Sequence, residues 1–82
     1  MSERQVSSPL PGVFYHRPAP GQPAYVEIGE AVAADQVIGL VEVMKQFAEV
    51  QAGTSGRIVA FLIEDGGTVG PGEGLVTIDS DA

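Results

Sequence analysis

Glycine and proline interrupt this chain so often that its apolar runs are too short for helices. Within these runs Val, Ile and aromatic side chains predominate, which favours strands. The runs expected to be strands are residues 12–15, 25–28, 37–41, 48–50, 57–63 and 75–78, with a loop or brief strand at 31–36. Short strands separated by glycine-rich turns predict an all-β sandwich or barrel.

The two halves of the chain resemble each other. Residues 29–32 align with residues 66–69, a shift of 37, and residues 12–14 align with residues 56–58, a shift of 44. The difference of seven equals the length of the proline-rich segment 18–24, which the interior of a strand or helix would not tolerate. We therefore expect a pseudo-twofold sandwich with one insertion in its first copy.

Met44 and Lys45 lie between two runs that are expected to form the strands of a hairpin. Two-residue hairpin turns need positive φ and usually contain Asn-Gly, Asp-Gly or Gly-Gly. Met and Lys adopt positive φ at a cost of about 1–2 kcal/mol per residue. Since this turn costs stability and exposes Lys45, we expect Lys45, the only lysine of the chain, to be the functional residue.

Pairing of the two hairpin strands about this turn assigns each side chain to a face. It places Val41 opposite Ala48, and Glu42 beside Phe47 near the tip. The face that includes Val41 and Ala48 is mostly apolar, so we expect it to point inward. The other face, which includes Ile38 and Glu42, is mixed and is expected to be partly wet.

Composition and charge exclude several classes of protein. The chain of 82 residues has no cysteine, which rules out disulfides and thiolate chemistry. Its net charge of −7 argues against binding to nucleic acid or to anionic membranes. Residues 1–9 lack the apolar core of a signal peptide, so we expect a cytoplasmic protein. The domain is expected to span residues 10–79, with flexible tails at 1–9 and 80–82.

The sequence contains no motif of an enzyme's own active site. His16 is the only histidine, and no Gly-x-Ser-x-Gly string accompanies it. The acidic residues do not have the spacing of a calcium loop. We therefore expect neither a catalytic site nor a metal site.

The string Glu-Val-Met-Lys at residues 42–45 resembles the biotin acceptor motif of biotin carboxyl carrier domains, whose usual string is Glu-Ala-Met-Lys-Met. The resemblance covers about residues 10–79 and is greatest to the carriers of bacterial acetyl-CoA carboxylases, in which a proline-containing insertion is called the thumb. The matching segments are residues 12–15, the insertion, 25–29, 55–59 and 72–78. The resemblance implies a flattened β-barrel of two four-stranded antiparallel sheets, with the acceptor lysine on an exposed hairpin turn.

The same resemblance implies that a biotin protein ligase attaches biotin covalently to Lys45. A biotin carboxylase would load a carboxyl group, and a carboxyltransferase would move it to an acyl-CoA, namely acetyl-CoA in fatty acid synthesis. This chain would be the non-catalytic carrier between them. The residues implied in ligase recognition are Glu42, Val43, Met44 and Gln46. The thumb-like residues are Pro18, Ala19, Pro20, Gly21, Gln22, Pro23 and Ala24.

Three residues depart from the usual pattern of that family. Gln46 stands where Met is usual, Val43 where Ala is common, and Arg17 where a small polar residue is common at the start of the insertion. Two other functions stay open at this point. One is a lipoyl carrier on the same fold, whose usual motif is Asp-Lys-Ala. The other is an unmodified β-sandwich that mediates protein interactions within a carboxylase-like assembly.

Overall fold

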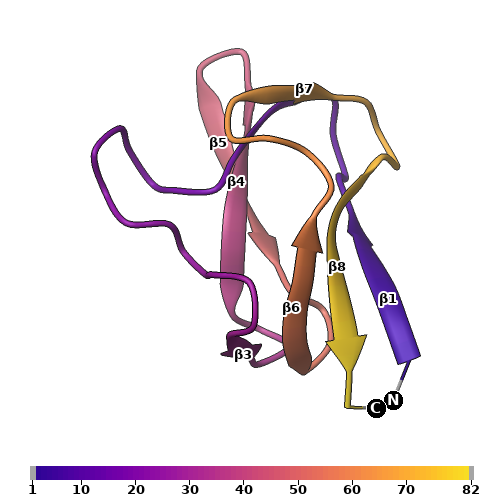
Figure 1. The fold of residues 1–82 in the computed structure, drawn as a ribbon. Helices are drawn as coiled ribbons and strands as arrows, with labels where there is room; N and C mark the ends of the chain where they lie inside the picture. Colours follow the sequence, from indigo (N-terminus) through magenta and orange to yellow (C-terminus); the bar gives the residue numbers. More distant parts are fainter. Residues whose placement is uncertain (1, 82) are drawn as a thin grey trace.

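The protein, seen in a computed structural model that describes residues 2–81, consists of two four-stranded antiparallel sheets (Figure 1). The strands are β1 (Ser2–Ser7), β2 (Gly12–Tyr15), β3 (Ala31–Val32), β4 (Val37–Val43), β5 (Gln46–Gln51), β6 (Gly56–Phe61), β7 (Gly67–Val69) and β8 (Gly74–Ser80). One sheet has the order β1-β8-β6-β3 and the other β5-β4-β2-β7. The described residues contain no helix, and the prediction of an all-β sandwich of two four-stranded sheets is confirmed.

The two sheets repeat each other strand for strand. A shift of 44 relates β1 to β5 and the start of β2 to the start of β6, and a shift of 37 relates β3 to the end of β7 and β4 to β8. Equivalent hydrogen bonds join the copies: Gly29 N–H donates to the Ile58 carbonyl over 2.8 Å, and Gly66 N–H donates to the Phe14 carbonyl over 2.7 Å. The predicted pseudo-twofold relation therefore holds for the strand order and for backbone hydrogen bonds between the two copies.

The core lies between the sheets and receives side chains from both. Its buried members are Phe14, Val26, Val32, Ile38, Val41, Val50, Ala52, Ile58, Val69, Leu75, Val76 and Ile78. Full burial of one such aliphatic or aromatic side chain stabilises the fold by about 1.5–3 kcal/mol. Because side chains of β4 and β5 belong to this core, burial fixes the position of the hairpin strands relative to the rest of the domain.

The prediction of flexible tails at 1–9 and 80–82 is wrong for the described residues at both ends, while residues 1 and 82 lie outside the described part of the chain. Ser2–Ser7 forms β1, which pairs with β8, and its Val6 packs against the core. Ser80 belongs to β8 and is fully buried, with its hydroxyl oxygen 2.6 Å from Oγ1 of Thr54. The polar sequence of the N-terminal segment carries little strand signal, because an edge strand gains its stability from pairing with its neighbour.

The prediction of a strand at residues 25–28 is also wrong. This segment lies in a loop before β3, and no strand pairing includes it. Val26 is nevertheless buried in the core, while Ile28 is exposed. The Tyr25 N–H donates to the His16 carbonyl over 2.8 Å, which closes the base of the insertion. The apolar pattern of the segment thus reflects one core contact, not a strand.

Strands β4 and β5 pair in the predicted register, with Val41 opposite Ala48 and Glu42 opposite Phe47. A bulge between Val37 and Gly39 changes the faces at the far end of β4. Ile38, which was predicted to lie on the wet face, is fully buried in the core. The reason is that a bulge adds one residue to a strand, so the strict alternation of its side chains is interrupted.

Strands β2 and β4 approach each other closely at Gly12. A Cβ atom at this position would overlap the carbonyl oxygen of Glu42. We expect Gly12→Ala to lower the free energy of unfolding by about 3 kcal/mol, through overpacking against backbone. The control is Gly53→Ala, at a site with positive φ and open space, where only backbone strain of about 1 kcal/mol is expected. Urea unfolding of both variants measures the difference, and equal losses would contradict the close approach.

Candidate functional site

The hairpin of β4 and β5 ends in a strained turn. Met44 and Lys45 have φ values of 50° and 68°, and they are the non-glycine residues with positive φ among those described. Positive φ at both central residues is typical of a type I′ turn, as predicted. Met44 is 92% exposed. Lys45 is exposed as well, and it forms no hydrogen bond or ion pair within residues 2–81.

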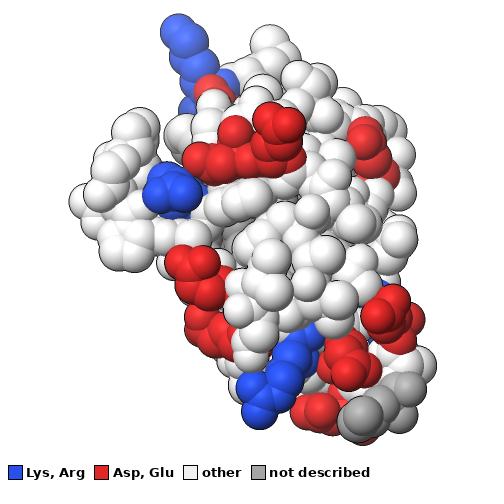
Figure 2. All heavy atoms as spheres, viewed as in Figure 1, with Lys and Arg blue, Asp and Glu red and all other residues white. Residues whose placement is uncertain are grey.

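The turn lies at the end of the molecule opposite the chain termini (Figure 1). Figure 2 shows a basic side chain extending from the end of the molecule where the hairpin lies, while acidic side chains are spread over the face in view. In the repeat, β4 corresponds to β8 and β5 corresponds to β1. The counterpart of the β4–β5 turn is therefore the place where the end of β8 lies beside the start of β1. Only the first copy therefore has a continuous turn at this position.

On one face of the hairpin, Tyr15, Glu42 and Phe47 form a cluster below the turn. The Tyr15 hydroxyl donates to Oε1 of Glu42 over 3.1 Å, and the rings of Tyr15 and Phe47 are 6.5 Å apart. The hydrogen bond to Glu42 is the main reason why the pKa of Tyr15 is raised, with desolvation and the nearby carboxylate charges adding to it. The phenol thus stays a donor at neutral pH and orients the Glu42 carboxylate.

The insertion is held by the turn between β6 and β7, which belongs to the second copy. Asp65 accepts hydrogen bonds from the His16 N–H over 2.7 Å and from Nε of Arg17 over 3.1 Å. Arg17 in turn donates to the Gln22 carbonyl over 3.0 Å. The bond from His16 is the main cause of a lowered pKa of Asp65, and the Arg17 charge adds to it. One carboxylate therefore anchors the base of the insertion.

A pocket of about 370 Å³ lies between the insertion and the outer face of the hairpin. Its lining residues are Tyr15, Arg17, Pro18, Ala19, Pro20, Leu40, Glu42, Phe47 and Asp65. Of the thumb-like residues, the first three take part in it, whereas Gly21, Gln22, Pro23 and Ala24 do not. Leu40 is buried on this outer face, which is consistent with cover by the insertion.

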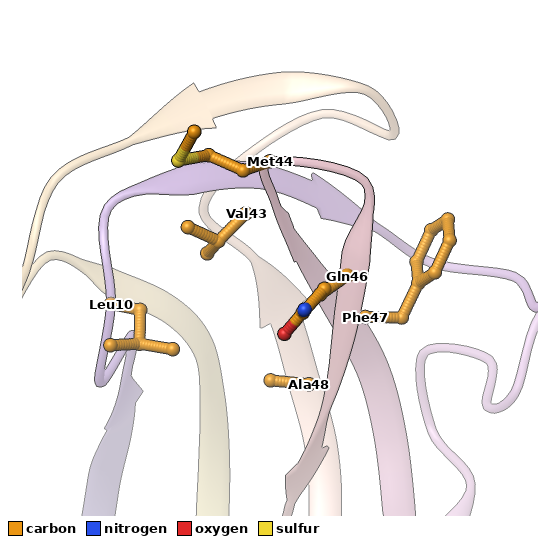
Figure 3. A pocket seen from close by; sticks show the side chains of 6 residues that line it. All are labelled: Leu10, Val43, Met44, Gln46, Phe47 and Ala48. Carbon is orange, nitrogen blue, oxygen red and sulfur yellow. The ribbon is translucent and has the colours of Figure 1, made fainter.

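The residues predicted for ligase recognition divide between the two faces of the hairpin. Glu42 lies on the face of the insertion, whereas Val43 and Gln46 form a cross-strand pair on the other face. Figure 3 shows Val43, Gln46 and Ala48 on the side of Leu10, while the ring of Phe47 points away. The structure thus brings Leu10, Tyr15 and Asp65 to the site, three residues that sequence reasoning missed because they are distant from the motif along the chain.

The chemistry available at this site is the presentation of an amine. Within residues 2–81 there is no group of three or more His, Asp or Glu side chains that could hold a metal ion. No helix in the same range is long and apolar enough to cross a membrane. The geometry sets one unpartnered lysine on a strained turn, beside the Glu42 carboxylate that Tyr15 orients.

A pseudo-twofold sandwich with a lysine exposed on a strained two-residue turn is the architecture of biotinyl and lipoyl domains. The family model described as "Biotin-requiring enzyme" matches residues 4–78, and the chain belongs to this biotinyl/lipoyl family.

Several relatives share most of the chain. It is 46% identical over 77 residues to the biotin carboxyl carrier protein of acetyl-CoA carboxylase of Chlamydia pneumoniae, covering 94% of this chain and 46% of that protein. The proteins of the same name of Pyropia yezoensis and Nostoc sp. are 36% and 35% identical over 75 and 77 residues. These matches cover 92% and 94% of this chain, and 48% and 42% of the relatives. The chain thus spans about half the length of the curated relatives it matches.

The Asp65 carboxylate should stabilise the protein in a pH-dependent way. Its pKa is lower in the folded than in the unfolded state, so its contribution is present above the ordinary carboxyl pKa and is lost as the pH falls through the folded value. We expect Asp65→Asn to lower the stability at pH 7 by at most about 1 kcal/mol, since the ion pair is partly exposed. Thermal unfolding from pH 7 to pH 3 measures this difference, which should begin to shrink as the pH falls below about 4, the ordinary carboxyl pKa.

The control for this experiment is Asp35→Asn, since Asp35 is exposed and forms no hydrogen bond or ion pair within the described residues. This variant should unfold like the wild type over the same pH range. A stability difference for Asp65→Asn that persists undiminished at pH 3 would contradict the linkage.

The insertion should be dispensable for folding. Its base is closed by the hydrogen bond between Tyr25 and His16, and the second copy needs no equivalent between β6 and β7. We expect a variant without residues 18–24 to unfold cooperatively, at a lower temperature because Leu40 loses its cover. Circular dichroism during heating measures this, and a broad, non-cooperative transition would contradict it.

Proposed function

We propose that this chain is the biotin-bearing domain of a biotin carboxyl carrier protein, with biotin joined to Nζ of Lys45. The observation that carries the proposal is the type I′ turn, which exposes an unpartnered lysine at a cost in backbone strain. Membership of the biotinyl/lipoyl family and the names of the relatives support it. The residues present fit the group, because nothing within residues 2–81 pairs with the amine that must form the amide.

In this proposal the chain presents an amine and the ligase supplies the chemistry. Nζ of Lys45 must lose a proton before it can attack the activated carboxyl group of biotin, so the ligase provides the base as well as the ATP-dependent activation. A stiff turn limits where Nζ can lie, which reduces the entropy lost when the lysine enters the ligase. Glu42, oriented by Tyr15, and the neighbours Val43, Met44 and Gln46 are the surface that the ligase would contact.

We further infer that the loaded carrier serves a biotin carboxylase and a carboxyltransferase, with acetyl-CoA as the acceptor of the carboxyl group. The names of the relatives support the carboxylase and its substrate. The biotin supplies the site that carries the carboxyl group, and this chain delivers it without catalysing either transfer. We place these steps in the cytoplasm, where ATP and acetyl-CoA are available.

Modification of Lys45 can be tested by mass. The protein is incubated with biotin, ATP and the biotin protein ligase of its own host, and the intact mass is recorded. We expect an increase of one biotin on the wild type and none on Lys45→Arg, which keeps the charge but cannot form the amide.

Two results would contradict the proposal. An unchanged mass of the wild type would favour an unmodified interaction module. The protein can also be expressed in cells that contain both a biotin ligase and a lipoyl ligase. A mass increase of one lipoyl group there would show a lipoyl carrier instead.

A further inference from the structure

A second pocket lies on the side of the hairpin that faces away from the insertion (Figure 3). It has a volume of about 480 Å³ and is lined by Leu10, Val43, Met44, Gln46, Phe47 and Ala48. Leu10 and Met44 are 42% and 92% exposed, so apolar surface remains in contact with water beside Lys45. The presentation of an amine does not require such a pocket.

Gln46 is the polar side chain of this pocket. Its carboxamide points to the side of Leu10 and Ala48 (Figure 3) and forms no hydrogen bond within residues 2–81. A carboxamide offers an N–H donor and a carbonyl acceptor side by side. The ureido group of biotin offers a carbonyl acceptor next to an N–H donor, so the two groups can exchange a pair of hydrogen bonds.

Resting on the proposed function, we propose that this pocket binds the bicyclic ring of the biotin on Lys45 when the arm is folded back. The Gln46 carboxamide pairs with the ureido edge, and Leu10, Val43 and Ala48 cover the apolar part of the ring. Because the arm is attached to the residue next to Gln46, the effective concentration of the ring at the pocket is in the millimolar range, as for a short flexible linker. A weak site is therefore enough to hold it.

The pocket under the insertion differs from this pocket in that its charged side chains already have partners. Glu42 accepts a hydrogen bond from Tyr15, and Asp65 holds the backbone of His16 and the guanidinium of Arg17. The side chain of Gln46, by contrast, forms no hydrogen bond within residues 2–81, so it can pair with the ureido group without giving up an existing bond.

The test uses the biotinylated domain, labelled with ¹³C and ¹⁵N, with unlabelled biotin. Isotope-filtered nuclear Overhauser effects should connect the biotin ring to the methyl groups of Leu10, Val43 and Ala48, and the side-chain amide of Gln46 should shift relative to the unmodified protein. In Gln46→Met, loss of the two hydrogen bonds should lower the ratio of bound to free ring roughly ten-fold. The matched control is Gln51→Met on the same strand, which should leave the contacts unchanged.

Several outcomes would overturn the inference. Contacts from the ring to Leu40 or Ala19 would place it under the insertion, and a ring without any protein contact would show a free arm. Contacts to Leu10 that persist undiminished in Gln46→Met would remove the role of Gln46.

A conjugate made without the ligase separates this inference from the proposed function. Since the chain has no cysteine, Lys45→Cys can be coupled to a thiol-reactive biotin with an arm of matched length. If the ligase leaves Lys45 unmodified, only the proposed function fails. If this conjugate lacks the contacts to Leu10, Val43 and Ala48, the pocket fails as a site for the ring.

Discussion

The register of β4 against β5 is the constraint on which the site depends. With Val43 opposite Gln46, only Met44 and Lys45 remain to reverse the chain, so both take positive φ. A slip of one residue would exchange the two faces of the hairpin and lengthen or shorten the turn. Val41 and Val50, buried on the inner face, oppose that slip because it would carry them into water. Burial in the core thus maintains a turn that the local sequence disfavours.

The second copy of the repeat stabilises the functional parts of the first. Strand β7 pairs with β2, and the turn before β7 supplies Asp65, which anchors the insertion. The β4–β5 hairpin is thus bounded on one face by the anchored insertion and on the other by Leu10, which follows β1. Both boundaries come from segments far from the motif in sequence, so the surroundings of Lys45 depend on the whole sandwich.

The errors of sequence-based reasoning have two causes. The segment of β1 is polar and was predicted to be a tail, although the shift of 44 that relates residues 12–14 to residues 56–58 also relates β1 to β5. Extension of the repeat to the N-terminus would have found this strand. The bulge that buries Ile38 and the loop at residues 25–28 left no such signal, because both depend on how one sheet packs against the other.

By itself, the sequence determined the strand class, the repeat with its insertion, and the strained turn that presents Lys45, because these features follow from local propensities and spacing. Only the tertiary structure decided that Tyr15 orients Glu42, that Asp65 holds the insertion, and that Leu10 and Gln46 share a pocket. The physical reason is that such contacts join residues distant in sequence, and their geometry is set when the two sheets pack on a common core. The position of the turn that exposes the lysine can thus be located from the sequence, whereas the surfaces beside it are set by the fold.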